Sequence, residues 1–143
     1  MARIKIDLPE TFSFTTRLAV RITDLNYGNH VGNDKVLSLL HEARVLYLVS
    51  LGYSERQLEG VSLIMADAGL IFKQEMYYGD ELLISIRPEA FSRVGFDLVY
   101  KIEKKNGEEW ITAVVAKTAM TCFNYDLKKV VSLPAAALAK LSA

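Results

Sequence analysis

Hydrophobic and polar residues alternate along much of this chain, with the period of two that is typical of half-buried β-strands. The first such segment spans residues 14–22, and a loop from Asp24 to Gly32, rich in glycine and asparagine, follows it. We therefore predict a strand that leads into a loop. The apolar positions that share one parity in this strand are Phe14, Leu18, Val20 and Ile22.

The pattern changes to a helical period between Asn33 and Leu51. Asn33 is predicted as the N-cap, and Gly52 is placed to end the helix, since glycine adopts the left-handed backbone that closes many helices. Apolar residues surround most of this helix, so we expect it to be largely buried, with a sheet wrapped around it. One stripe of the helix carries Val36, Leu40, Ala43 and Tyr47.

Strands dominate the rest of the chain. Gly79-Asp80 and Asn106-Gly107 mark tight turns, and the second dipeptide is a strong hairpin signal. Pro134 opens an alanine-rich tail helix. A strand, a long helix and a run of antiparallel strands predict one α+β domain over residues 1–143, with a helix packed on a curved sheet of five to six strands. The predicted later strands cover residues 70–78, 82–86, 94–102, 110–123 and 130–133.

Composition narrows the possible functions. The chain has 143 residues, 17 basic and 17 acidic side chains, and one cysteine. A formal net charge of zero argues against a nucleic-acid partner, because such proteins cancel phosphate charge. No run approaches the roughly 18 apolar residues of a membrane span, and charges interrupt the first residues, so no signal peptide is expected. We expect a cytoplasmic protein with no membrane contact.

The candidate chemistry gathers where the first strand meets the helix, just before and within the first helical turn. A helix start carries unpaired N–H groups and about half a positive charge, and glycine lets a ligand carbonyl approach the backbone. Such donors stabilise the oxyanion that forms when water attacks a thioester, which makes this segment a candidate oxyanion hole. A polar, well-capped loop without a ligand is the alternative. The candidate catalytic residues here are Asn26 and His30, and the candidate substrate contacts are Asp24, Tyr27, Asn29, Val31, Gly32 and Asn33.

Two acids in apolar surroundings are further catalytic candidates, as the base that activates water. Glu42 lies in the middle of a mostly apolar helix, where a buried acid needs a partner or a purpose. Asp67 lies among small and apolar residues, between two expected strand segments. The structural alternatives are a salt bridge or loop hydrogen bond for Glu42 and a β-bulge or turn for Asp67.

Several enzyme classes lack their residues in this chain. No Gly-x-Ser-x-Gly elbow is present, which excludes the α/β-hydrolase mechanism. Two histidines and one cysteine are too few for a zinc site, and no phosphate-binding loop occurs. We expect neither a metal nor a cofactor.

The same residues resemble the hotdog-fold thioesterases of the 4-hydroxybenzoyl-CoA thioesterase type. That family's pattern is roughly Asp-x-Asp-x-x-Gly-His-Val-x-Asn, followed on the helix by Glu-x-Ala-Arg. Further matches at a later turn and near the end of the chain extend the resemblance over nearly the whole sequence. The matching stretches are Asp24-Leu25-Asn26, His30-Val31-Gly32-Asn33, Glu42-Ala43-Arg44, Gly79-Asp80-Glu81-Leu82 and Leu133-Pro134.

The resemblance implies hydrolysis of an acyl-CoA or acyl-carrier-protein thioester without a metal or cofactor. It also implies a homodimer or tetramer whose sheets join and whose sites lie at the subunit interface. The chain departs from the pattern where Asn26 stands in the slot of the second Asp, the nucleophile or base of many relatives, and where Asn29 replaces Gly. An amide cannot do the work of that Asp. Asn26, Asn29 and His30 are then expected to orient substrate or water, while Glu42 or Asp67 acts as base.

Two other functions stay open on the sequence. A hotdog protein that binds acyl-CoA or another apolar ligand without hydrolysing it is supported by the missing Asp in the loop. A hydratase or dehydratase shares the fold, although its usual His-Phe-Pro signature is absent. Catalysis is favoured over binding if Glu42 or Asp67 reaches a site shared with Asn26 and His30.

Overall fold

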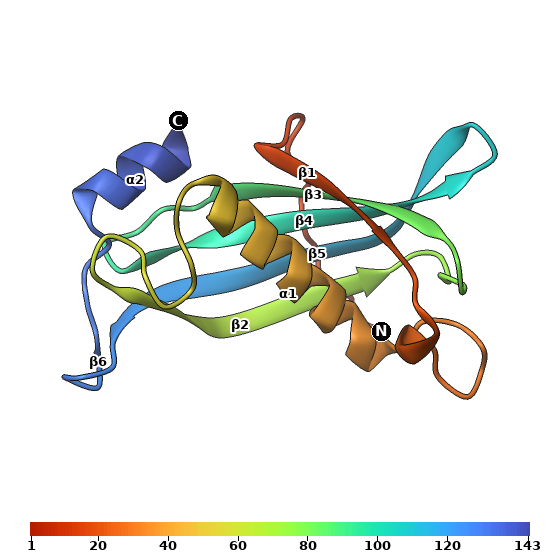
Figure 1. Cartoon of the computed structure of the whole chain (residues 1–143), viewed down its shortest axis with the longest axis horizontal. Helices are drawn as coiled ribbons and strands as arrows, with labels where there is room; N and C mark the ends of the chain where they lie inside the picture. The colour runs from red at the N-terminus through yellow and green to blue at the C-terminus, as the bar shows by residue number, and fades with distance from the viewer.

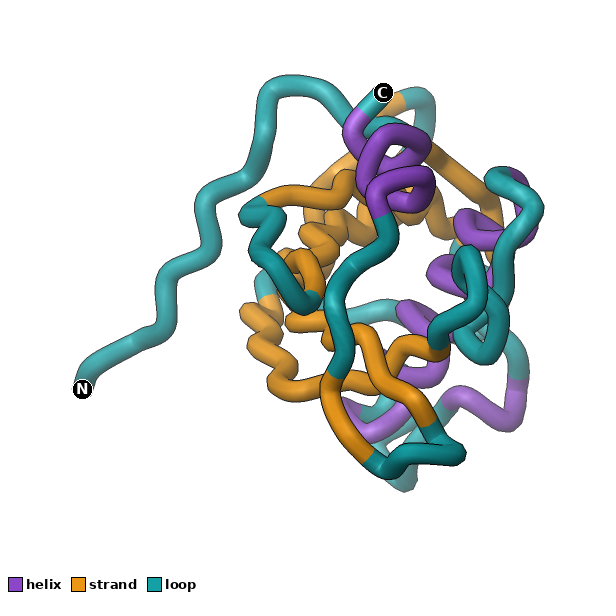
Figure 2. Tube along the Cα trace, turned by 90° about the vertical axis from the view of Figure 1, so that its left-hand side faces the viewer, coloured by secondary structure: helices purple, strands orange, loops and turns teal.

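The structure is a computed structural model that describes residues 1–143, and it shows one antiparallel sheet with a long helix across one face (Figure 1). The strand order is β1-β3-β4-β5-β2, and the short β6 pairs with β5. The N-terminal segment passes behind the sheet, on the face away from α1, as Figure 2 also shows. The elements are β1 (Phe14–Ala19), α1 (Asn33–Ser50), β2 (Ser62–Phe72), β3 (Glu81–Glu89), β4 (Gly95–Asn106), β5 (Glu109–Asn124), β6 (Lys129–Val130) and α2 (Ala135–Ser142).

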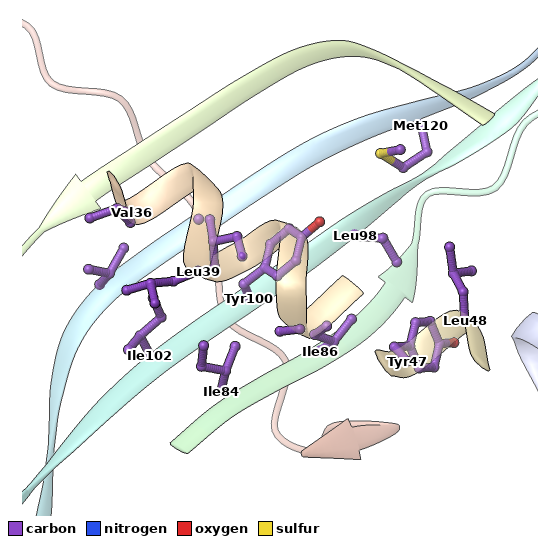
Figure 3. Close-up of a cluster of buried hydrophobic side chains, with 14 of the residues drawn as sticks. Val36, Leu39, Tyr47, Leu48, Ile84, Ile86, Leu98, Tyr100, Ile102 and Met120 are labelled. Carbon is purple, nitrogen blue, oxygen red and sulfur yellow. The ribbon is translucent and has the colours of Figure 1, made fainter. Parts of the chain in front are cut away.

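The hydrophobic core lies between α1 and the sheet, and its strand side is built mainly by β3, β4 and β5 (Figure 3). The predicted stripe of α1 is buried, whereas Leu37, Glu42, Val45 and Val49 on the other side of the helix are exposed. The prediction of a largely buried helix therefore holds for one side only, because a single sheet covers a single face of α1. The labelled core residues of Figure 3 are Val36, Leu39, Tyr47, Leu48, Ile84, Ile86, Leu98, Tyr100, Ile102 and Met120.

A buried polar chain ties α1 to the sheet and to the loop that follows the helix. Arg44 is 5% exposed, and its guanidinium donates to the Glu55 carboxylate and to the Tyr100 hydroxyl, at 3.2 Å for the second bond. Tyr100 also shares a 2.7 Å hydrogen bond with Thr118. Every buried side-chain nitrogen and oxygen atom in this hydrogen-bonded series has a partner, so the guanidinium is buried without an unmatched charge.

Several predicted features are confirmed. Gly79 and Gly107 have positive φ angles of 81° and 68° in the two predicted turns, and the second turn joins β4 to β5. Gly52 ends α1 with a φ of 81°. The tail helix begins directly after Pro134. Neither helix combines the length and the apolar character that a membrane crossing requires.

Three boundaries differ from the prediction. Asn33 is the first residue of α1 rather than its N-cap, which is Gly32 and offers no side-chain cap. Ile22 is 66% exposed and lies in a 3₁₀ turn, because the backbone N–H of Arg21 bonds the Asp24 carboxylate and turns the chain. The last strand, β6, covers Lys129–Val130 rather than the predicted residues 130–133.

The segment predicted as a strand over residues 70–78 divides into two parts. β2 starts earlier, at Ser62, and ends at Phe72. The residues after Phe72 turn toward the loop before α1, where the Val31 N–H donates to the Met76 carbonyl at 2.8 Å and a β-bridge joins His30 to Tyr77. Backbone pairing with that loop therefore replaces the expected pairing within the sheet.

Candidate active site

The loop before α1 is shaped by the side chain of Asn26. The Gly28 N–H donates to Asn26 Oδ1 at 2.8 Å, which is an Asx turn. The Asn26 N–H donates to the His30 carbonyl at 2.9 Å, and the Asn29 N–H donates to the Asn26 carbonyl at 3.1 Å. Asn29 closes this turn with a φ of 64°, a conformation that Asn tolerates better than most residues. The amide oxygen of Asn26 is thus engaged inside the loop.

Among the other polar residues of the loop, Asp24 is buried and supports the loop, whereas two residues are exposed. Asp24 is 2% exposed, and its carboxylate accepts the Arg21 N–H at 2.9 Å and pairs with the Arg21 guanidinium at 3.3 Å. Its carbonyl accepts the Gly32 N–H at 3.2 Å. Asp24 therefore holds the loop against the start of α1. Tyr27 and Asn29 are exposed.

A pocket of about 320 Å³ lies between the start of α1 and the segment that follows β2. Its volume is within the range of small-molecule sites, and half of its lining is hydrophobic. Three of the ten predicted site residues, and one of the four predicted catalytic residues, line it. The lining consists of His30, Val31, Asn33, Val36, Phe72, Lys73, Gln74, Glu75, Met76 and Val114.

His30 is half-buried at the edge of this pocket. Its Nδ1 lies 3.1 Å from the Val31 carbonyl, which can only accept, so we assign the proton to Nδ1. Nε2 is then a hydrogen-bond acceptor. It lies 3.9 Å from Oε1 of Glu75, too far for a direct hydrogen bond.

The start of α1 supplies donors to the same pocket. The N-cap Gly32 has no side chain to satisfy them, and the backbone N–H groups of Asn33 and Asp34 donate to no acceptor within the chain. Asn33 also lines the pocket. Unpaired N–H groups and the positive end of the helix dipole therefore lie beside His30.

Glu42 lies away from this pocket. The prediction that it is buried is wrong, because it stands on the exposed side of α1. It lines a separate hollow of about 370 Å³ between the helix and the end of β1. Leu18, Ala19, Arg21, Ser38 and Leu39 complete that hollow.

Asp67 also lies away from the pocket. It follows a register shift between Met65 and Asp67 in β2, which confirms the β-bulge alternative. Its Oδ1 accepts a 2.8 Å hydrogen bond from Lys117 Nζ, and this bond lowers the pKa of the carboxyl group. Within one chain, neither Glu42 nor Asp67 reaches a site shared with Asn26 and His30.

Sequence reasoning missed Glu75 and Phe72 as pocket residues, because it placed both in one regular strand. The available signal was the polar run Lys73-Gln74-Glu75, which interrupts the alternation of apolar and polar positions. Such an interruption indicates that the chain leaves the sheet. The segment then carries its side chains to the helix start.

A metal site and a cysteine nucleophile each depend on particular side chains. No three side chains among His, Cys, Asp and Glu cluster closely enough to hold a metal ion. Cys122 is buried, and burial raises the pKa of its thiol to about 11. It therefore stays protonated near neutral pH and lacks the thiolate that a cysteine nucleophile needs.

The thioesterase-like superfamily matches residues 20–141, and the chain belongs to this family. A 1,4-dihydroxy-2-naphthoyl-CoA hydrolase of Thermosynechococcus vestitus is 25% identical over 118 residues, which cover 80% of this chain and 79% of that protein. The family membership confirms the predicted resemblance to hotdog-fold thioesterases.

Solved structures of lower sequence identity share the fold of this chain. A 1,4-dihydroxy-2-naphthoyl-CoA thioesterase from Synechocystis superposes with a TM-score of 0.80 at 23% identity, over 90% of this chain and 95% of that one. A variant of 4-hydroxybenzoyl-CoA thioesterase, in complex with 4-hydroxybenzoyl-CoA, gives 0.81 at 16% identity, over 90% and 97%. The predicted α+β hotdog fold is thereby confirmed.

Proposed function

We propose that the chain hydrolyses acyl-CoA thioesters in the pocket between the start of α1 and the segment after β2. The observation that carries the proposal is the convergence of the α1 start and His30 on one partly apolar pocket. Thioester hydrolysis needs donors for an oxyanion and an acceptor for a water proton, and the pocket has both. The family and the named relatives support the same class of reaction.

In this proposal the thioester carbonyl oxygen lies against the unpaired N–H groups of Asn33 and Asp34. These donors stabilise the negative charge that develops as water attacks the carbonyl carbon, and one such donor contributes about 10²–10³ in rate in other enzymes. Nε2 of His30 accepts a hydrogen bond from the attacking water and orients it. A carboxylate then takes the proton of that water.

We further propose an aromatic acyl group and coenzyme A as the carrier. The acyl end of the pocket would contact Val36, Phe72, Met76 and Val114, which offer apolar and aromatic surface. Lys73 on the pocket lining is the cation placed to meet a CoA phosphate. The names of the relatives, which refer to naphthoyl-CoA and hydroxybenzoyl-CoA, support this choice. An acyl carrier protein is the alternative carrier.

The proposal includes a homodimer in the cytoplasm. β2 is an edge strand of 11 residues, and its middle part is exposed at Ala66, Asp67 and Ala68. Open edges of this length usually pair or are covered. Antiparallel pairing of two β2 strands would join the sheets and bring the partner close to Phe72, at the pocket. A tetramer remains compatible with this arrangement.

Binding without hydrolysis is the second candidate function. It is favoured by one observation: Asn26, in the slot of the family's second Asp, has its side-chain oxygen bonded to the Gly28 N–H and offers no carboxylate to the pocket. A protein that holds acyl-CoA in the same pocket would need no base.

The test is thiol release from a panel of aromatic, branched, short and long acyl-CoAs, with thermal shift measured on the same panel. Turnover that is fastest with aromatic acyl groups would support the full proposal. Turnover without that preference would overturn only the choice of acyl group. Stabilisation by acyl-CoA without any thiol release would establish the binding protein instead.

A further inference from the structure

Glu75 is the one carboxylate that lines the candidate active-site pocket. Its Oε1 is the atom that lies 3.9 Å from Nε2 of His30. Both atoms accept hydrogen bonds, and their separation leaves no direct bond between them when the histidine is neutral. Two acceptors at this spacing can receive the two hydrogens of one water molecule.

The carboxylate of Glu75 is held in place from its other side. The Tyr77 hydroxyl donates to Oε2 at 2.6 Å, which leaves Oε1 directed toward His30. This bond raises the pKa of the Tyr77 hydroxyl, so the phenol remains a donor. This hydrogen bond therefore favours one orientation of the carboxylate, on a side chain that is 59% exposed.

The backbone under Glu75 is also fixed. Lys104 Nζ donates to the Glu75 carbonyl at 2.7 Å and lies 4.9 Å from the centre of the Tyr77 ring. Asp80 Oδ2 accepts the Tyr77 N–H at 2.8 Å, and the β-bridge between His30 and Tyr77 joins this segment to the loop before α1. None of these contacts uses the Glu75 carboxylate. They hold the backbone of Glu75 beside the loop that carries His30.

We propose that Glu75 is the catalytic base of the hydrolysis, an inference that rests on the proposed function. Water bound between Glu75 and His30 gives one proton to the Glu75 carboxylate as its oxygen bonds to the thioester carbonyl carbon. The tetrahedral oxyanion then collapses and the carbon–sulfur bond breaks. The leaving thiolate takes the proton from Glu75, and the carboxylic acid product loses its own proton to solvent. Glu75 returns to its starting state, and no other reactant is needed.

This assignment gives the pocket the carboxylate that the loop before α1 does not provide. Asn26 provides an amide in place of the family's Asp, and Glu42 and Asp67 lie outside the pocket. Glu75 reaches the same space from the segment after β2. The base in this proposal therefore comes from the segment after β2 rather than from the loop before α1.

The experiment compares wild type with Glu75→Gln, in steady-state thiol release from an aromatic acyl-CoA. Gln keeps a side-chain oxygen for the Tyr77 hydroxyl, so the fold and KM are expected to persist. We expect kcat to fall about 100-fold or more, within the range for general bases. Glu75→Ala is expected to lose as much activity and to recover part of it when formate is added. A residue that only supports the loop would show no such rescue.

Glu81→Gln is the matched control, because the same change at this partly exposed residue removes only a surface pair with Arg17. It should keep wild-type kcat. Full activity of Glu75→Gln beside an active wild type would overturn the inference and leave the proposed function standing. So would a loss of activity in Glu75→Ala that formate cannot restore at any concentration. A wild type that releases no thiol from any substrate would overturn both.

Discussion

Two hollows of similar size flank α1, and they differ in what surrounds the helix at each place. The pocket of about 320 Å³ lies at the helix start, where unpaired N–H groups, His30 and Glu75 meet apolar side chains. The hollow of about 370 Å³ lies about two turns further along, where Glu42 and Arg21 line the wall beside β1. The slightly larger hollow holds an acid that the sequence favoured, yet only the smaller pocket combines unpaired backbone N–H groups with an imidazole and a carboxylate.

The difference shows that a carboxylate alone does not define a hydrolytic site. Beside the second hollow, the backbone N–H groups of α1 are engaged in helical hydrogen bonds, so the helix offers no backbone donor to an oxyanion there. At the helix start these groups are free, and the loop before α1 adds an imidazole. The position along the helix thus decides which hollow can perform the reaction.

After the loss expected for Glu75→Gln, the largest effect is expected for His30→Ala, which removes the hydrogen-bond acceptor that orients the attacking water. We expect kcat to fall about 100-fold, because a misplacement of a reacting group by about 1 Å can cost roughly 10² in rate. The backbone bridge to Tyr77 does not depend on the side chain, so the fold should persist. The measurement is thiol release, with circular dichroism as the control for folding. Unchanged kcat would show that the reaction occurs elsewhere, with the second hollow as the next candidate.

Glu55→Gln should weaken the packing of α1, the helix that borders both hollows. The change removes the carboxylate partner of the buried Arg44 guanidinium. Because Glu55 is partly exposed, we expect the free energy of unfolding to fall by about 2 kcal/mol, below the range for a fully buried pair. Urea denaturation measures the change, and Glu81→Gln, in an exposed pair, should change it by less than about 1 kcal/mol. Equal effects of the two substitutions would contradict the anchoring role of Arg44.

Gly28→Ala should affect the pocket without affecting the fold. A Cβ at this position would lie 3.3 Å from His30 Nε2 and 3.2 Å from Asn26 Oδ1, while the backbone there needs no left-handed conformation. The methyl group would crowd the nitrogen that holds water. We expect kcat to fall about tenfold, or about 1.4 kcal/mol in the activation free energy. A melting temperature equal to that of wild type is the required control, and unchanged kcat would mean that Nε2 plays no part.

Glu42→Gln is expected to have the smallest effect. Glu42 is exposed and lines only the second hollow, so kcat should change by less than about twofold. The assay is again thiol release, run beside Glu75→Gln. A large loss in Glu42→Gln, with retained folding, would return the catalytic base to α1 and reverse the comparison between the two hollows.

The sequence by itself determined the order and type of most elements. Alternation and helical periodicity depend on which side chains face the core, and this information is local. The hairpin at Asn106-Gly107, the end of α1 at Gly52 and the helix after Pro134 were predicted because each depends on the backbone preference of a glycine or proline nearby. The same local information identified His30 and the helix start.

Only the tertiary structure decided which acid lies beside His30 and the start of α1. Glu42 and Asp67 were favoured because their neighbours in sequence are apolar, but burial depends on what packs against a side chain from elsewhere in the fold. The sheet covers one side of α1 and leaves Glu42 on the other, and Lys117 from β5 pairs with Asp67. Glu75 lies far from His30 in sequence, and the pairing of their backbone segments brings the two together, a long-range contact that no local pattern encodes.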